Sequence, residues 1–92
     1  MEDHYNSADH RIIIIVERII QDRAISICGP IRTEHKLVEI GLTSLDLARL
    51  VLLVEDEFGL EIPTNDIVPA NFRSISTVSQ LVTKLVTEVS DG

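Results

Sequence analysis

The chain has 92 residues, enough for one small domain with a modest core, and its formal net charge of −7 disfavours a nucleic-acid partner. Cys28 is the single cysteine, which excludes an internal disulfide and a zinc site built from several cysteines. The apolar run Ile12–Val16 is too short to span a membrane, and no signal-peptide pattern precedes it. We therefore expect a cytoplasmic domain without membrane insertion.

The first expected element is a helix over residues 10–24, with Asp9 as its N-cap and residues 1–8 as a flexible polar tail. The β-branched run Ile12–Val16 by itself favours a strand. The continuation favours a helix, because four apolar residues recur on one helical face. These residues are Ile12, Ile15, Val16 and Ile19.

A long connection, residues 24–40, follows this helix and contains the turn pair Gly29–Pro30. Connections of this length in compact domains are usually functional or held in place by their own side chains. The apolar residues expected to hold this one against the helices are Ile25, Ile27, Ile31, Leu37 and Ile40.

The next helix, Ser44–Phe58, has both ends marked in the sequence. Thr43 is a good N-cap, and Asp46 stands three residues later, where a carboxylate can reach back to the cap. Gly59 suits a left-handed C-cap, and Pro63 prevents continuation of the helix. Ser44 is therefore expected as the first helical residue, at a helix end that favours an attached phosphate.

This helix carries two apolar stripes at helical spacing. The core face is expected to hold Leu47, Leu50, Val51, Val54 and Phe58. The second stripe holds Leu45, Ala48 and Leu52, and Arg49, Glu55 and Asp56 flank it. Two interpretations are open: the helix is buried on two sides, or the second stripe is an exposed docking surface that leads up to Ser44.

The C-terminal third predicts short turns at 64–68, capped by Thr64, and at 70–73, with Phe72 as a core anchor. Ser76 or Ser74 then caps a last helix with apolar residues at regular helical spacing. These residues are Val78, Leu81, Val82, Leu85 and Val89. The expected fold is all-α: a small four-helix bundle of three principal helices and a short third helix, with a long loop between the first two.

No residue pattern in the chain indicates catalysis. His4, His10 and His35 have no spacing to one another, to Cys28 or to carboxylates that suggests a metal site or a catalytic triad. The adjacent acids 55–57 are typical of a solvated helix face. We therefore expect no catalytic residue, no metal ligand and no enzymatic activity.

Three motifs resemble the acyl and peptidyl carrier protein family: GLTSLDL at residues 41–47, EDEFGLEIP at 55–63 and STVSQL at 76–81. The resemblance covers residues 37–85. It implies that Ser44 carries 4′-phosphopantetheine, transferred from coenzyme A by a phosphopantetheinyl transferase. The thiol of this arm would hold an acyl or aminoacyl cargo as a thioester. In one departure, the family's usual aspartate before the serine is Thr43.

The resemblance implies a discrete, monomeric carrier whose single domain is residues 9–90. Its partners would be the transferase, an acyl- or aminoacyl-loading ligase or synthase, and downstream acyltransferases. The residues expected to dock these partners are Leu45, Ala48, Leu52, Glu55 and Asp56. The acidic residues around the central helix would steer basic partners.

Two other functions stay open. Thr43 permits an unmodified helical protein–protein interaction module that kept the carrier fold, and the second stripe permits a small regulatory four-helix protein. The cargo is also open among fatty acyl groups of fatty acid biosynthesis, polyketides of secondary metabolism, and aminoacyl groups. Arg49 and the segment 71–74 (NFRS) point away from general fatty acid synthesis.

Overall fold

The computed structural model describes residues 8–27 and 29–91, and side chains up to residue 87. Its elements in chain order are α1 (Ala8–Arg23), α2 (Leu37–Ile40), α3 (Ser44–Phe58), the 3₁₀ helices η2 (Thr64–Asp66) and η3 (Pro69–Phe72), and α4 (Ile75–Asp91). The described part contains no strand, only one isolated bridge between Lys36 and Ser74. The expected all-α bundle of three principal helices is confirmed, and η2 and η3 take the place of the short third helix.

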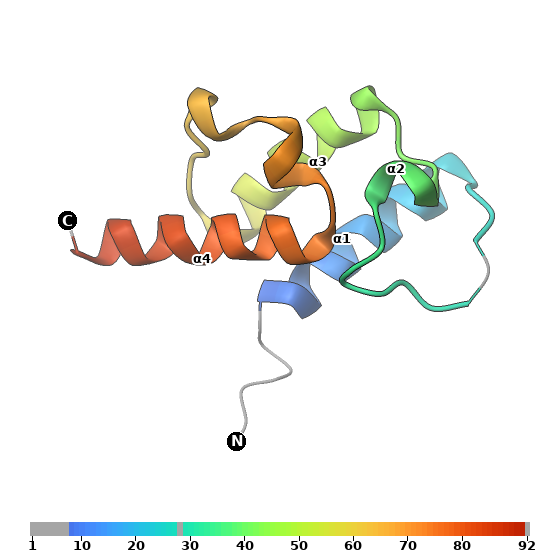
Figure 1. Ribbon diagram of the computed structural model, residues 1–92, viewed down its shortest axis with the longest axis horizontal. Helices are drawn as coiled ribbons and strands as arrows, with labels where there is room; N and C mark the ends of the chain where they lie inside the picture. The colour runs from blue at the N-terminus through green and yellow to red at the C-terminus, as the bar shows by residue number, and fades with distance from the viewer. Residues whose placement is uncertain (1–7, 28, 92) are drawn as a thin grey trace, which may run out of the picture.

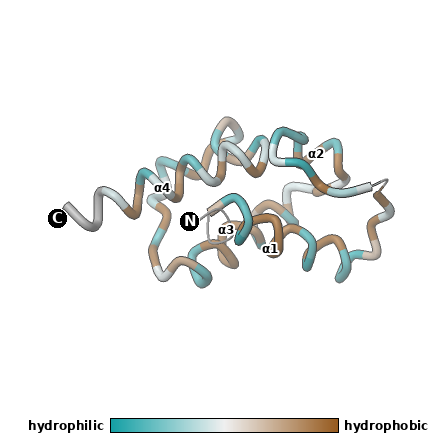
Figure 2. Tube along the Cα trace, turned by 90° about the horizontal axis from the view of Figure 1, so that it is seen from below, coloured by the Kyte–Doolittle hydropathy of each residue, from teal (hydrophilic) through white to brown (hydrophobic). Residues whose placement is uncertain are grey.

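The three long helices pack through α1, which contacts both α3 and α4. The segment from the end of α3 through η2 and η3 returns the chain to the start of α4 (Figure 1). Hydrophobic and hydrophilic residues alternate along these helices (Figure 2), as expected for helices buried on one side. None of the described helices has the length and apolar character needed to cross a membrane.

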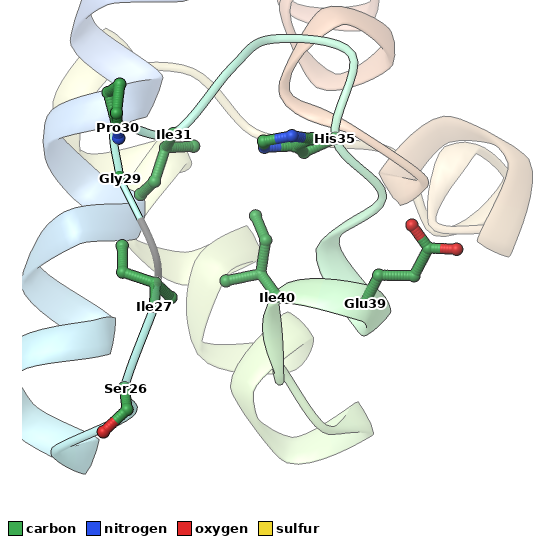
Figure 3. Close-up of a pocket in the computed structure, with 8 residues that line it drawn as sticks. All are labelled: Ser26, Ile27, Gly29, Pro30, Ile31, His35, Glu39 and Ile40. Carbon is green, nitrogen blue, oxygen red and sulfur yellow. The ribbon is translucent and has the colours of Figure 1, made fainter.

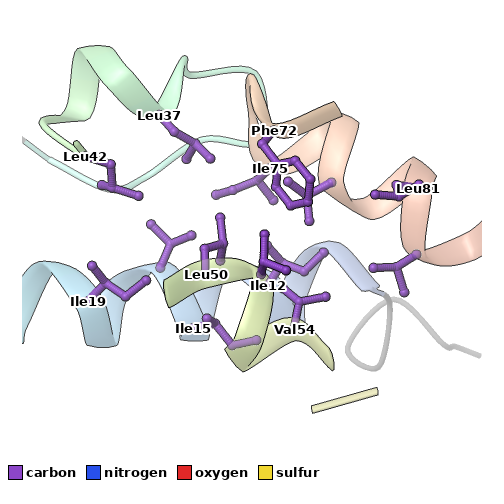
Figure 4. Packing of buried hydrophobic residues seen from close by; sticks show 14 of the residues in the cluster. Ile12, Ile15, Ile19, Leu37, Leu42, Leu50, Val54, Phe72, Ile75 and Leu81 are labelled. Carbon is purple, nitrogen blue, oxygen red and sulfur yellow. The ribbon is translucent and has the colours of Figure 1, made fainter. Parts of the chain in front are cut away.

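The core is aliphatic, as the composition indicates. All four α1 residues assigned to the core face are buried, together with Ile20. Side chains from α1 meet Leu50 and Val54 of α3, and Leu37, Phe72 and Ile75 lie across from them (Figure 4). The β-branched run of α1 is thus accommodated in a helix because tertiary burial outweighs its strand propensity.

The ends of α1 differ from the expectation. The helix already includes Ala8, so Asp9 lies in the first turn and is not the N-cap; the rest of the predicted tail, residues 1–7, lies outside the described residues. The last helical residue is Arg23, and Ala24 leaves the helix in the left-handed region with a φ of 54°. A carboxylate in the first turn still favours the helix dipole.

The long connection is less irregular than expected, because α2 forms inside it. Four residues are too few to produce a readable helical period, so this short helix was not predicted. Leu37 is completely buried, and Ile25, Ile31 and Ile40 pack against the core. Ile27 does not: it is exposed, and its predicted role in holding the loop is wrong.

Backbone pairing holds the end of this connection against the start of α4. The N–H of Leu37 donates to the carbonyl of Arg73 at 2.8 Å, and the N–H of Ser76 donates to the carbonyl of Thr33 at 2.9 Å. These bonds join segments about 40 residues apart in the chain and fix α2 beside η3.

The elements before α4 begin earlier than expected. Thr64 is the first residue of η2 and makes no cap, and Pro69 opens η3, where a proline suits the first helical position. Ser74 is the cap of α4, since its Oγ accepts the N–H of Thr77 at 3.3 Å. Ser76 lies inside the helix.

Gly41 ends α2 at a φ of 121°, and a Cβ added there would lie 3.2 Å from Cγ2 of Ile25. We expect Gly41→Ala to lower the free energy of unfolding by about 1–3 kcal/mol, because an L-residue is strained in this conformation. Gly59→Asn is the matched control: its φ of 63° tolerates asparagine, and no atom lies within 4 Å of an added Cβ. Equal losses in denaturant unfolding would contradict this account.

Candidate functional site

Ser44 is the exposed first residue of α3, and the residues around it form the predicted helix cap. Oγ1 of Thr43 accepts the N–H of Asp46 at 3.3 Å, and Oδ2 of Asp46 accepts the N–H of Thr43 at 2.8 Å. This reciprocal pair is a capping box, which fixes the first turn of the helix. At the other end, Gly59 makes the expected left-handed C-cap.

The carboxylate of Asp46 does more than cap its own helix. Its side chain is buried, and Oδ2 also accepts the hydroxyl of Thr43 at 3.1 Å and pairs with the guanidinium of Arg23 at the end of α1. The hydrogen bond from Arg23, followed by that from the backbone of Thr43, lowers the pKa of Asp46 below its usual value. Arg23 was not predicted as a partner of Asp46, because it is 23 residues away along the chain.

Ion pairs tie both ends of α3 to α1. They are Arg23–Asp46, Arg49–Asp22 and Arg11–Glu57. At the C-terminal end, the guanidinium of Arg11 also lies 4.3 Å from the ring centroid of Phe58. The pairs Arg49–Asp22 and Arg11–Glu57 are exposed, so each contributes little stability. Asp46 in the third pair is buried, and this pair holds the start of α3 against the end of α1.

The second apolar stripe of α3 is on the surface. Leu45 is 81% exposed and Leu52 is 65% exposed, and Ala48 between them is exposed as well. The interpretation that α3 is buried on two sides is therefore wrong. On its core side Leu50 and Val54 are completely buried, as expected.

The two acidic residues that flank this stripe differ in their surroundings. Oε2 of Glu55 accepts the N–H of Ile62 at 2.8 Å, so this carboxylate holds the chain that follows α3. Asp56 is exposed on the side of α3 near α1, where it lines a small hollow with Arg11 and Arg18. The predicted acidic flank is therefore divided between a structural and a solvent-facing carboxylate.

Ser44 also opens onto an apolar groove of about 420 Å³. Its residues come from α2, α3 and the segment 67–72: Val38, Leu47, Ala48, Val51, Ile67, Val68, Pro69 and Phe72. Val38 is 63% exposed, although it is apolar. Val38, Ile67 and Val68 were not predicted as site residues, because they come close to Ser44 only through the tertiary fold.

A second hollow, of about 310 Å³, lies away from Ser44 in the connection before α2. His35, Glu39 and Ile40 form one side, and the other side is formed by Ser26, Ile27, Gly29, Pro30 and Ile31 (Figure 3). His35 Nδ1 accepts the N–H of Arg32 at 3.3 Å, so this ring helps to shape the loop. The two hollows share no residue.

An exposed serine at a capped helix start, beside an apolar groove, is the arrangement of a site for a phosphate-linked group. Comparison with known proteins decides the family, since residues 15–85 match the family model for the phosphopantetheine attachment site. The chain belongs to this family of carrier proteins. It carries its cargo on a covalently attached 4′-phosphopantetheine arm.

Two curated relatives of this carrier protein come from Bradyrhizobium diazoefficiens. Aminoacyl carrier protein 1 is 40% identical over 73 residues, which cover 79% of each chain. Aminoacyl carrier protein 2 is 36% identical over 76 residues, which cover 83% of each chain.

Solved structures with the same fold come from a carrier protein bound to an enzyme. One is the Bradyrhizobium japonicum glycine:carrier protein ligase complexed with glycylated carrier protein, with a TM-score of 0.71, 32% identity and coverage of 80% of this chain and 96% of that one. In the other, the ligase is complexed with its cognate carrier protein and an analogue of glycyl adenylate. Its TM-score is 0.73 at 32% identity, with coverage of 84% and 96%.

Acid should destabilise the fold of the carrier protein by protonating Asp46. Because its pKa is lower in the folded chain than the ordinary 3.8, the ionised carboxylate stabilises the fold above that pH. This contribution should disappear as the pH falls from 3.8 through the lower folded-state pKa. We expect Asp46→Asn to lose this part of the pH dependence in denaturant unfolding at pH 2–6, and Arg23→Gln to reduce it. An unchanged slope in Asp46→Asn would contradict the assignment.

Proposed function

We propose that Ser44 is the attachment site of the phosphopantetheine arm and that the cargo is an amino acid, loaded by an amino acid:carrier protein ligase. The observation that carries the first part is the position of Ser44. It is exposed at the first residue of a helix whose start is fixed by the capping box and by Arg23. The serine therefore needs only to be accessible and oriented, and the partner enzymes supply the chemistry.

The residues around Ser44 fit the arm. The phosphodiester would lie at the positive end of α3, where backbone N–H groups favour an anion. The groove beside it offers apolar side chains from Val38, Val51 and Ile67 to the aliphatic part of pantetheine. When bound, the arm supplies a thiol that holds the cargo as a reactive thioester.

Attachment requires a phosphopantetheinyl transferase. Ser44 Oγ forms a bond to the phosphorus atom that bears pantetheine in coenzyme A, the pyrophosphate bond breaks, and adenosine bisphosphate leaves. The hydroxyl proton passes to a base of the transferase. The part of this chain is to hold Ser44 at a fixed helix start, which keeps the hydroxyl in one place during the encounter.

Support for an aminoacyl cargo comes from the relatives. Both curated relatives are named aminoacyl carrier proteins, and the matching solved chain is bound to a glycine:carrier protein ligase. Incubating the modified protein with a glycine:carrier protein ligase, ATP and each of several amino acids tests the proposal, and the intact mass identifies the cargo.

Some predictions from the sequence stay predictions: the domain limits 9–90, the cytoplasmic location, the monomeric state, the absence of catalysis and the downstream acyltransferases. The exposure of Ser44 supports a modified carrier and not an unmodified interaction module, because such a module does not need an accessible serine at this position.

Ser44→Ala should abolish the mass gain on incubation with coenzyme A and a broad-specificity transferase, because no hydroxyl remains at the start of α3. The side chain is exposed, so circular dichroism and unfolding should stay within about 0.5 kcal/mol of the parent protein. The matched control is Ser79→Ala in α4, which keeps Ser44 and should gain the full mass. A mass gain that persists in Ser44→Ala would disprove the assignment.

We also propose that the exposed stripe of Leu45, Ala48 and Leu52 docks the partner enzymes. These side chains stand on the same helix as Ser44, and exposed leucines on a small domain are candidates for an interface. Asp56 adds a solvent-facing charge next to this stripe, and Glu55 adds a charge that is partly engaged by Ile62. Asp56→Lys is therefore the cleaner test of electrostatic steering.

Leu52→Ala should change the free energy of unfolding by less than about 0.5 kcal/mol, because the side chain is on the surface. Loading by the ligase should nevertheless slow, since the partner loses an apolar contact. Leu50→Ala is the control: it empties a completely buried site and should cost about 2–5 kcal/mol. If Leu52→Ala is as destabilising as Leu50→Ala, or loads at the parent rate, the docking surface is wrong.

A further inference from the structure

One wall of the groove beside Ser44 lies opposite α3, and few interactions hold its residues in place. It consists of Ile67 and Val68, which lie between the 3₁₀ helices η2 and η3, and Pro69, the first residue of η3. Ile67 is 43% exposed and Val68 is 39% exposed, so burial does not fix their positions. Short 3₁₀ helices have poorer hydrogen-bond geometry than α-helices and depend on anchors outside themselves.

The anchor of this wall is Asn71. Its side-chain Nδ2 donates to the carbonyl of Asp66 at 2.8 Å, and its backbone N–H donates to the carbonyl of Val68 at 3.0 Å. The first bond spans the wall, from Asn71 after it to Asp66 before it, and the second joins Asn71 to Val68 inside it. Phe72, the next residue, is buried and attaches the segment to the core.

Asn71 acts from behind the wall. It does not line the groove; instead it faces a hollow on the other side of the segment, together with Gln80 and Lys84 of α4. At the other end of the segment, Glu55 holds Ile62. The wall therefore lies between two side-chain-to-backbone bonds, and the bond from Asn71 is the one directly beside it.

We propose that Asn71 is a positioning residue: it holds the wall of Ile67–Pro69 beside Ser44 and thereby sets the surface that a loading ligase meets. The ligase part rests on the proposed function, whereas the position of the wall does not. A wall that is less firmly held adopts several conformations, and the free-energy cost of ordering it on binding lowers the affinity for the partner. The effect should fall on encounter with the ligase and not on the chemical step.

The test compares Asn71→Ala and Asn71→Asp with the parent protein. The aspartate has nearly the same shape but lacks the amide donor, so both variants lose the bond to Asp66. Asn65→Ala is the matched control: Asn65 is an exposed asparagine in η2, and its side chain makes no hydrogen bond within the described residues.

Hydrogen exchange gives the local readout. The amide of Ile67 donates to the carbonyl of Thr64, and the amide of Asn71 donates to the carbonyl of Val68. Both amides should exchange about five-fold faster in both Asn71 variants, the size expected when one hydrogen bond is lost. The amides of Leu50 and Val54 in α3 should be unchanged, and Asn65→Ala should match the parent throughout. Unchanged exchange at Ile67 and Asn71 would overturn the proposal.

Loading kinetics give the functional readout, with the phosphopantetheinylated protein as the variable substrate of a glycine:carrier protein ligase. We expect KM to rise about five-fold in both Asn71 variants and kcat to stay near the parent value. A faster exchange with an unchanged KM would overturn the link to the ligase. If the ligase does not load the parent protein, a glycine:carrier protein ligase is not its partner, and the exchange measurement still decides the role of Asn71.

Discussion

One carboxylate oxygen connects the parts of this carrier protein that its function requires. Oδ2 of Asp46 accepts the backbone N–H and the hydroxyl of Thr43, and it pairs with the guanidinium of Arg23. The first two bonds start α3, and the third ties that start to the end of α1. Ser44 lies within this loop of bonds without taking part in it, so its hydroxyl stays available while its backbone is held.

The packing of the hydrophobic core also holds α3 in place. α1 contributes a row of stiff β-branched side chains, and Leu50 and Val54 of α3 pack against them. Because one face of α3 makes all of these core contacts, the opposite face can remain apolar and exposed without weakening the fold. The division of α3 into a buried and an exposed apolar face thus allows the same helix to be a structural element and to carry the stripe proposed as a docking surface.

The groove beside Ser44 combines two kinds of wall. α3 is held by its caps and by three ion pairs, whereas the wall of Ile67–Pro69 has exposed side chains and few hydrogen bonds. Regions with few buried contacts open at lower free-energy cost than helices in the core. The position of this wall therefore depends on individual bonds such as the one from Asn71, whereas the position of Ser44 is fixed by the cap of α3.

Local sequence patterns were sufficient for the all-α fold, for both ends of α3 and for Ser44 at its start, because caps and helical periods depend on residues only a few positions apart. They also identified the buried face of α1. They could not decide whether Leu45 and Leu52 were core or surface, since both faces of α3 are apolar and the packing of α3 against α1 selects the buried one. Arg23, Val38 and Asn71 were found only in the tertiary structure. Arg23 meets Asp46, and Val38 lies beside the Ser44 groove, only because the chain folds back on itself. Asn71 bonds to Asp66 within a turn that has no helical period of its own.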